Sequence, residues 1–257
     1  MPIWSCTIYR INPAVSQDVK DMLQTVNKEY VYRKLEDNTL TFYIKSRQQN
    51  EYGQLIEIDM DDLLELYNRE RGTYYAKITF SIALQIFEKE PVTDFVAIFG
   101  NRQRVHGFRA QFTEVFWREK HTSEFPMFNV RFLLREREGC LRSEFPDMRE
   151  ISVDNVRDIY VRRAVIKGSF LEQSPEYSKY ILSEEIGGTV RHFGISVRDF
   201  LKERVIILSS DGTIYTRMGR ASIEIDTVYM VLCKLEKCDA LRISTLRKAY
   251  RTINTYI

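Results

Sequence analysis

The chain reads RQRVHGFRAQFTEVFWREKHTSEFPMFNVRFLLREREGCLR from Arg102 to Arg142. Apolar residues stand at every second position in two parts of this stretch, around Phe108–Phe112 and around Phe128–Leu134. An alternation of period two is typical of β-strands that are buried on one face. The other face of these strands would carry Arg109, Arg131 and Arg135. We therefore predict an antiparallel sheet with an apolar side and a cationic side that suits an anionic polymer.

Composition gives this prediction no general support. The 257 residues include 38 Lys and Arg against 36 Asp and Glu, a formal net charge of +2. A hydrophobic fraction of 44% with 29% charged residues is typical of a folded globular protein. Because the molecule has almost no net charge, a nucleic-acid site requires local segregation of charge.

The first half of the chain mixes strands and helices without regular alternation. We expect these elements in order: a strand at 3–10, a helix capped by Ser16, a hairpin of 30–35 with 39–46, a strand at 55–58, a helix from Asp59 to Gly72, a strand at 73–80 continuing as a helix that ends before Pro91, and a strand at 95–99. Such a mixture favours an α+β fold with a largely antiparallel sheet.

The second half is expected to be smaller and more helical. We expect these elements in order: a helix at 153–167 capped by Ser152, a helix from Pro175, a short helix at 196–203, a hairpin around Asp211-Gly212, a helix capped by Asp226, and a last helix from Leu241 to Asn254. The predicted domains are therefore 1–165, an α+β domain with basic antiparallel strands, and 166–257, a smaller α+β domain with C-terminal helices.

Two DNA-binding arrangements fit the second domain. A basic last helix after a short turn is typical of a helix-turn-helix, and the order helix, helix, hairpin is typical of a winged helix. The basic residues that would contact phosphates are Arg217, Arg220, Arg247, Lys248 and Arg251. The alternative is a solvated surface, with the sheet arginines paired to Glu114, Glu136 and Glu138 and the last helix an ordinary amphipathic one. The leading hypothesis is a nucleic-acid-binding protein, with DNA favoured.

Two other functions compete with it. The density of Tyr and Phe favours a protein-interaction subunit of a larger assembly, because aromatic residues are enriched at interfaces. A metal-dependent nuclease would need converging carboxylates, for which the candidates are Asp59, Asp61, Asp62 and Asp94. Those acidic residues also suit the first turn of a helix, where negative charge is stabilised.

Neither a cofactor nor a catalytic motif is indicated, so a non-enzymatic role is favoured. Glycines are too scattered for a phosphate loop, and three His with four Cys offer no zinc-ligand spacing. We expect Cys6, Cys140, Cys233 and Cys238 to be free thiols. Met1–Arg10 lacks the pattern of a signal peptide, and no apolar run is long enough to cross a bilayer. These features predict a soluble intracellular protein without a membrane partner.

Overall fold

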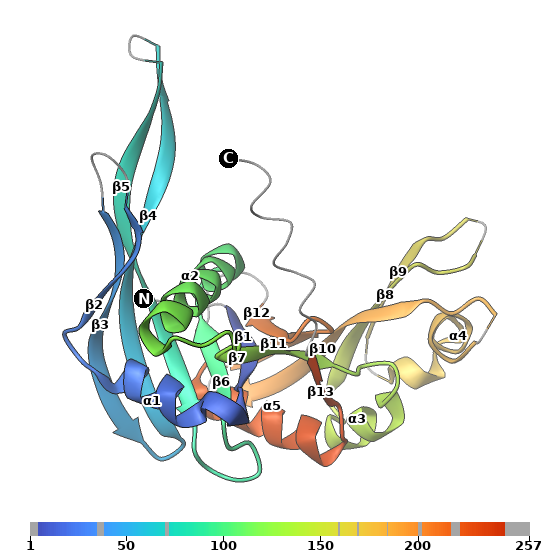
Figure 1. The fold of residues 1–257 in the computed structure, drawn as a ribbon. Coiled ribbons are helices and arrows are strands. Elements are labelled where there is room, and N and C mark those ends of the chain that lie inside the picture. Colours follow the sequence, from blue (N-terminus) through green and yellow to red (C-terminus); the bar gives the residue numbers. More distant parts are fainter. Residues whose placement is uncertain are drawn as a thin grey trace.

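The computed structural model describes residues 5–34, 39–69, 72–158, 160–168, 170–183, 185–199, 202–216 and 222–244. Within these residues thirteen strands form one sheet, with helices on both of its faces (Figure 1). Eleven strands follow one another in the order β2 (Glu29–Lys34), β3 (Thr39–Asn50), β4 (Gly53–Asn68), β5 (Gly72–Phe87), β6 (Phe95–Phe99), β1 (Ser5–Ile11), β12 (Thr213–Thr216), β11 (Lys202–Ser209), β10 (Thr189–Asp199), β8 (Met148–Asp154) and β9 (Arg163–Lys167). Every strand pairing is antiparallel. The α+β class with a largely antiparallel sheet is therefore confirmed.

Two helices cover one face of the half of the sheet that runs from β2 to β1. They are α1 (Ser16–Gln24), which follows a short 3-10 turn (Pro13–Val15), and α2 (Arg102–Lys120). Helix α1 buries Val19, Met22 and Leu23. Helix α2 buries a row of aromatic residues, and Phe108 meets Phe42 of β3 edge to face at 5.7 Å between ring centroids. This first core ends at Met60 of β4 and Phe80 of β5.

A second core lies on the opposite face of the sheet. Helices α3 (Glu138–Glu144) and α5 (Ile225–Lys237) pack there against β1, β7 and β10–β12. A short 3-10 turn (Leu171–Gln173), α4 (Pro175–Tyr177) and a π-helical turn (Ser178–Leu182) cover the end of this half near β8 and β9. Successive side chains of β1 point to opposite faces of the sheet, so that Ile8 packs in the second core and Tyr9 in the first.

Strand β1 is the point at which the sheet divides. Its first residues pair with β12, and Tyr9–Ile11 pair on that side with β7 (Met127–Phe132). Strand β13 (Leu241–Ser244) pairs in turn with β7. The Asp211-Gly212 turn lies between β12 and β7, where these two strands diverge along β1. A Cβ on Gly212 would lie 2.1 Å from the Val130 carbonyl oxygen, and its φ is +85°, so this position requires glycine.

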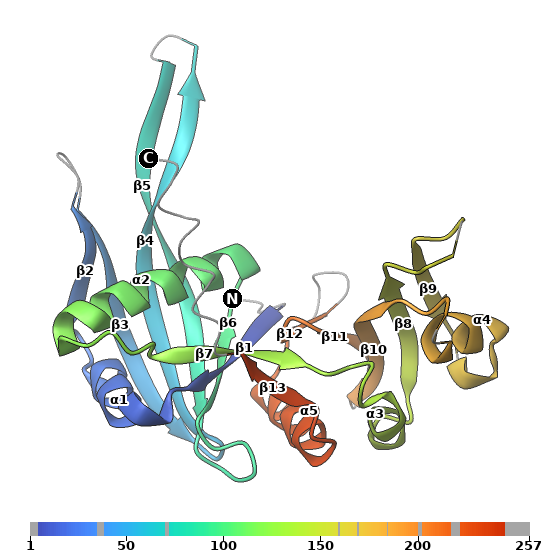
Figure 2. The same ribbon diagram turned by 45° about the vertical axis from the view of Figure 1, so that its right-hand side comes forward.

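The β4–β5 hairpin extends well beyond the rest of the sheet (Figure 2). Its ladders with β3 and β6 end at Met60 and Ala83, whereas the two strands stay paired as far as Asn68 and Gly72. We call residues 62–68 and 72–78 the β4–β5 ribbon. Its residues are exposed or half-buried wherever their side chains are described.

Several predicted elements are confirmed. The opening strand, α1, the hairpin of β2 and β3, β6, β7, the Asp211-Gly212 hairpin and α5 all lie where the sequence predicts them. The helix predicted from Pro175 to Ile186 begins as expected but ends at Leu182. Helix α5 buries Val228, Val231, Leu232 and Leu235, the predicted inner face. The predicted capping residues Ser16 and Asp226 lie instead within the first turn of α1 and α5, whose N-caps are Val15 and Glu224 without a side-chain capping hydrogen bond.

Other elements were predicted wrongly. Residues 108–113 belong to helix α2, because the apolar set that is buried includes Val105, Phe108, Phe112 and Val115, which recur every three or four residues. The segment after Asp59 continues β4, and the segment at 82–87 continues β5. The predicted helix at 153–167 is replaced by the end of β8, a connection and β9.

In the second predicted domain, too, strands replace expected helices. The expected helix at 196–203 lies in β10 and β11, so the winged-helix order of helix, helix and hairpin is absent there. The expected last helix begins instead with strand β13, and its remainder, residues 245–254, lies outside the described residues. The predicted boundary near residue 165 stays a prediction, and strands from both sides of it share the one sheet. In the described part of the chain, no helix combines the length and apolar character needed to cross a bilayer.

Candidate nucleic-acid interface

Arg131 and Arg242 lie opposite each other on the paired strands β7 and β13. Both are exposed, and residues opposite each other on antiparallel strands point to the same face of the sheet. Neither makes an ion pair or a side-chain hydrogen bond within the part of the chain that the structure describes. Like charges directly opposite each other on two strands are destabilising. An anion between the two guanidinium groups would remove that repulsion.

Arg109 reaches the same face from helix α2. Its Nη1 donates to Asn129 Oδ1 at 2.6 Å, and its guanidinium carbon lies 5.3 Å from the centre of the Tyr9 ring. Asn129 precedes Arg131 by two residues, so both side chains point to the same side of β7. The contact with Asn129 therefore places Arg109 beside the Arg131–Arg242 pair.

Arg102 and His106 lie on the same side of α2 as Arg109, since the three are spaced by four and three residues. The guanidinium group of Arg102 contacts Asp211 at 2.6 Å. Partial burial of the imidazole, with the charges of Arg102 and Arg109, lowers the pKa of His106 below its usual value, and Asp211 offsets part of this effect. We call Arg102, Arg109, Arg131 and Arg242 the arginine patch.

The Asp211 carboxylate forms an ion pair with Arg102 of this patch. Burial opposes its ionisation, but hydrogen bonds from Ser209 and Thr213 and the charge of Arg102 hold the pKa of Asp211 below its usual value. Asp211 thus neutralises part of the charge of Arg102, whereas Arg131 and Arg242 have no carboxylate partner among the described residues. The patch therefore keeps an excess of positive charge.

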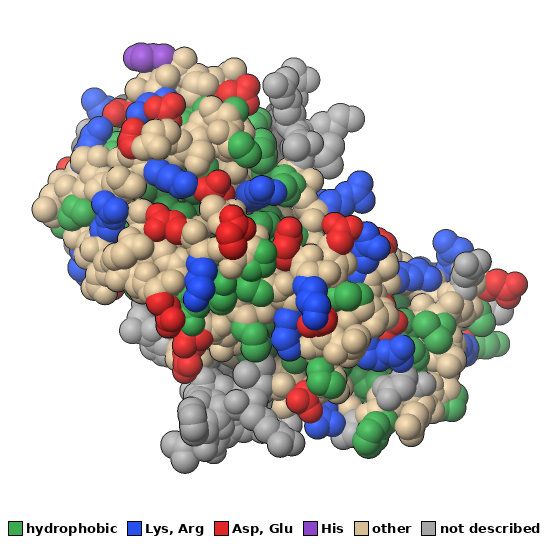
Figure 3. All heavy atoms as spheres, turned by 90° about the horizontal axis from the view of Figure 1, so that it is seen from below, with side chains coloured by type: hydrophobic (Ala, Val, Ile, Leu, Met, Phe, Trp, Pro, Cys, Tyr) green, Lys and Arg blue, Asp and Glu red, His purple; other side chains and the backbone are tan. Residues whose placement is uncertain are grey.

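The underside of the molecule differs from the arginine patch in its charge distribution. Figure 3 shows Lys and Arg side chains interspersed with Asp and Glu over that face, with apolar patches between them. Around helices α3 and α5, ion pairs join Lys237 to Glu144 at 2.5 Å and Arg137 to Asp239. Because the charges alternate, this face resembles the solvated surface that the alternative interpretation of the sequence describes.

The structure assigns the predicted sheet arginines to different elements. Arg109 is on a helix instead of a strand, and Arg131 is on β7 as predicted. Arg135 follows β7 and donates through Nη1 to the Gly188 carbonyl oxygen at 2.6 Å, so it holds a loop. The remaining predicted contacts, Arg217, Arg220, Arg247, Lys248 and Arg251, lie outside the described residues.

Sequence reasoning missed Arg242 because it placed this residue on a helix. The alternation in Leu241-Arg242-Ile243-Ser244 is the strand signal that was available. Arg102, His106 and Asn129 were missed because the strand interpretation of 108–113 separated them from Arg109. The helical spacing of Val105, Phe108 and Phe112 would have brought them together.

The carboxylates of the nuclease alternative do not converge. Asp61 is buried and accepts from Thr41 and Thr79, with Lys77 Nζ at 2.8 Å. Asp94 contacts Lys20 at 2.6 Å. Asp59 accepts from Ser81, and Asp62 accepts from the Leu63 amide. Among the residues with described positions, no group of His, Cys, Asp and Glu is arranged to hold a metal ion.

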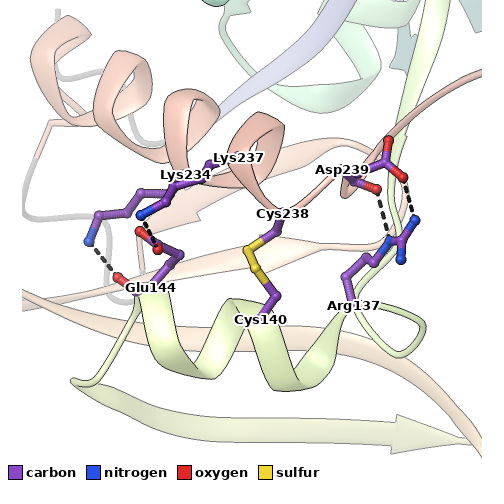
Figure 4. The surroundings of a disulfide bond; sticks show 7 residues. All are labelled: Arg137, Cys140, Glu144, Lys234, Lys237, Cys238 and Asp239. Atoms are coloured by element: carbon purple, nitrogen blue, oxygen red, sulfur yellow. Dashed lines mark hydrogen bonds and ion pairs between the residues drawn. A yellow bond between two sulfur atoms is a disulfide. The ribbon is translucent and has the colours of Figure 1, made fainter.

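Two of the cysteines are not free thiols. Cys140 of α3 and Cys238 at the end of α5 form a disulfide, with their Cα atoms 5.7 Å apart (Figure 4). Cys6 and Cys233 are free, and burial raises the pKa of Cys6 far above its usual value. The prediction of four free thiols is therefore wrong, because sequence spacing does not reveal that α3 and α5 pack together.

Comparison with known proteins adds no functional information. No protein-family model matches the chain, and a search of curated proteins finds no match.

Proposed function

We propose that this protein binds nucleic acid, with DNA the favoured ligand, through phosphate contacts from the arginine patch. The observation that supports the proposal is the exposed pair Arg131 and Arg242, which lie side by side without a carboxylate partner in the described structure. Guanidinium groups bind phosphate oxygens bidentately, so two adjacent arginines suit a phosphate backbone. Arg109 and Arg102 would extend these contacts along α2.

Strand β13 is also followed in the sequence by a basic segment. Ser244, its last residue, lies opposite Asn129, and the chain then continues with Arg247, Lys248 and Arg251. The predicted contacts of the C-terminal segment therefore follow directly in sequence from a strand of the patch. The expected ligand is a polyanion read mainly through its backbone, because no base-reading element is identified.

The test is a binding titration of the full chain with labelled duplex DNA, single-stranded DNA and RNA over a range of salt concentrations. Replacing Arg131 and Arg242 together by Ala should weaken binding at least about tenfold, since hydrogen bonds to charged groups contribute roughly 1.5–3 kcal/mol each. The slope of log K against log salt should fall by about 2, one for each lost phosphate contact.

Arg47→Ala provides a matched control. Arg47 is exposed and lies on β3, which is separated from β1 by β4, β5 and β6. It has no ion pair among the described residues. This variant should bind like the wild type. Binding that is absent in all variants, or that is equally weak in Arg47→Ala and the double variant, would contradict the proposal.

A role as a subunit of an assembly has its own support in the β4–β5 ribbon. Leu64, Leu66, Tyr74, Ala76 and Ile78 share one face of this hairpin, and that face continues the apolar face that the first core covers. Leu64 and Tyr74 are 44% and 43% exposed. Binding of a protein partner there should respond little to salt, whereas phosphate binding weakens steeply.

A further inference from the structure

We propose that the Cys140–Cys238 disulfide is a redox control on the arginine patch. The inference rests on the proposed function, because it concerns the same Arg131–Arg242 pair. The disulfide joins the segment that follows β7 to the segment that precedes β13. The covalent bond therefore links the two chain segments that adjoin one end of the β7–β13 pair, the strand pair that carries both arginines.

The connection between the disulfide and β13 is short. Cys238 is separated from the start of β13 only by Asp239 and Ala240. The Leu133 amide, immediately after β7, donates to the Ala240 carbonyl oxygen at 2.8 Å. A change in the position of Cys238 is thus passed directly to the strand that holds Arg242.

Besides the disulfide, strand β13 is held at its start by core packing of Ala240 and Leu241, and along its length only by β7 among the described strands. It pairs with β7 over four residues, Leu241–Ser244, and no other strand pairs with it among those described. Short edge strands open more readily than the centre of a sheet. The disulfide holds this strand at its first end, so loss of the covalent bond should increase local opening of the β7–β13 ladder.

Other contacts would keep the reduced protein folded. Figure 4 shows Lys237 and Lys234 of α5 beside Glu144 of α3, and Arg137 beside Asp239. Lys234 donates to the Glu144 carbonyl oxygen at 2.6 Å. Four buried residues of α5 also remain in the second core. Reduction should therefore loosen β13 without unfolding α5, which makes the change reversible.

The two cysteines of the disulfide differ in exposure. Cys140 is exposed and Cys238 is only 5% exposed, so a reductant reaches the disulfide from the Cys140 side. A dithiol would supply two electrons and two protons. The sulfur–sulfur bond breaks, Cys140 and Cys238 become thiols, and the dithiol becomes a disulfide through a mixed-disulfide intermediate.

The first experiment compares oxidised and dithiothreitol-reduced full chain. Under denaturing conditions the oxidised protein should expose two titratable thiols, those of Cys6 and Cys233, and the reduced protein should expose all four. Hydrogen exchange at residues 241–244 should be faster after reduction. Four thiols in the oxidised protein, or unchanged exchange in this strand, would overturn the proposal.

The second experiment measures binding of labelled duplex DNA in both states. Reduction should raise the dissociation constant about fivefold or more, the lower end of coupling between linked sites. Cys140→Ser should bind like reduced wild type in either state, and Cys233→Ser, the matched control, should keep the full response. Equal binding in both states would overturn the redox control. If neither state binds DNA but exchange in β13 still rises, the nucleic-acid proposal fails while the redox control of this strand stands.

Discussion

The guanidinium group of Arg109 on helix α2 donates to the side chain of Asn129 on strand β7 at 2.6 Å. This contact joins two elements that the sequence presents as consecutive strands. Together with the Tyr9 ring, whose centre lies 5.3 Å from the guanidinium carbon, it fixes the direction of this charge. The position of the arginine patch depends on it, because Asn129 and Arg131 share one side of β7.

Replacement of Asn129 by Ala should weaken nucleic-acid binding about two- to fivefold, since a typical hydrogen bond contributes roughly 0.5–1.5 kcal/mol net. The charge of Arg109 remains, so the slope of affinity against salt should stay at its wild-type value. Titrations at several salt concentrations measure both quantities. A lowered slope would show that Asn129 affects the number of phosphate contacts and would contradict an orienting role.

Binding should strengthen as the pH falls through the pKa of His106. That pKa lies below the usual value of about 6.5, so the imidazole is neutral at pH 7 and becomes a further positive charge only in more acidic solution. His106→Gln should remove this gain. Affinity measured between pH 8 and pH 5 checks the prediction.

His121→Asn provides the control for the His106 variant. His121 ends α2 in the left-handed region, with φ +48°, which Asn tolerates. It lies about 22 Å from His106 at 1.5 Å per residue of helix. This variant should keep the wild-type pH response, and loss of the response in both variants would contradict a specific effect of His106.

Asp61→Asn should lower the free energy of unfolding by about 1–3 kcal/mol, the cost of leaving buried partners without a charged acceptor. Burial opposes ionisation, but hydrogen bonds from Lys77, Thr79 and Thr41 outweigh it and hold the pKa of Asp61 below its usual value. A lowered pKa in the folded state adds stability that is present above the unfolded value, near 3.9, and is lost as the pH falls through the folded value.

Urea denaturation near pH 7 and near pH 3 measures this contribution. The difference between wild type and Asp61→Asn should be largest at the higher pH. Asp62→Asn is the control, because Asp62 is exposed and should change stability by no more than about 0.5 kcal/mol. Equal losses in the two variants would contradict the importance of the Asp61 network.

The end of the first core on β4 can be located by two substitutions on the same face of the strand. Met60 is 4% exposed and Leu64 is 44% exposed. Met60→Ala should cost about 2–5 kcal/mol, as in other buried positions. Leu64→Ala should change the free energy of unfolding by no more than about 0.5 kcal/mol. A large loss for Leu64→Ala that depends on protein concentration would instead indicate that another molecule covers the β4–β5 ribbon.

Local chemistry in the sequence determined several elements. Asp211-Gly212 between two apolar runs predicts the β11–β12 hairpin, because only residues that tolerate positive φ suit so tight a turn. Helices α1 and α5 were predicted with their buried residues, since a three- and four-residue spacing continues over several turns. Strand β7 was predicted from its alternation. In each case the deciding interaction lies within a few residues of the chain.

Packing between distant segments decided the rest. Gly72 suits the end of a helix and the turn of a hairpin equally, because both use positive φ, here +71°. The long ladder between β4 and β5 selects the hairpin. Phe108 and Phe112 fit either periodicity, and burial against Phe42 and its neighbours on β3 and β4 selects the helix.

For the candidate site, too, the sequence determined some features and the tertiary structure determined others. The sequence indicated that arginines of this region would carry the charge, because residue type is written directly in the chain. Only the tertiary structure shows that Arg131 lies opposite Arg242 and that Cys140 is bonded to Cys238. It also shows that Arg135 donates to a backbone carbonyl oxygen. Those partners are far apart along the chain, and strand register and helix packing, which depend on all the segments together, bring them into contact.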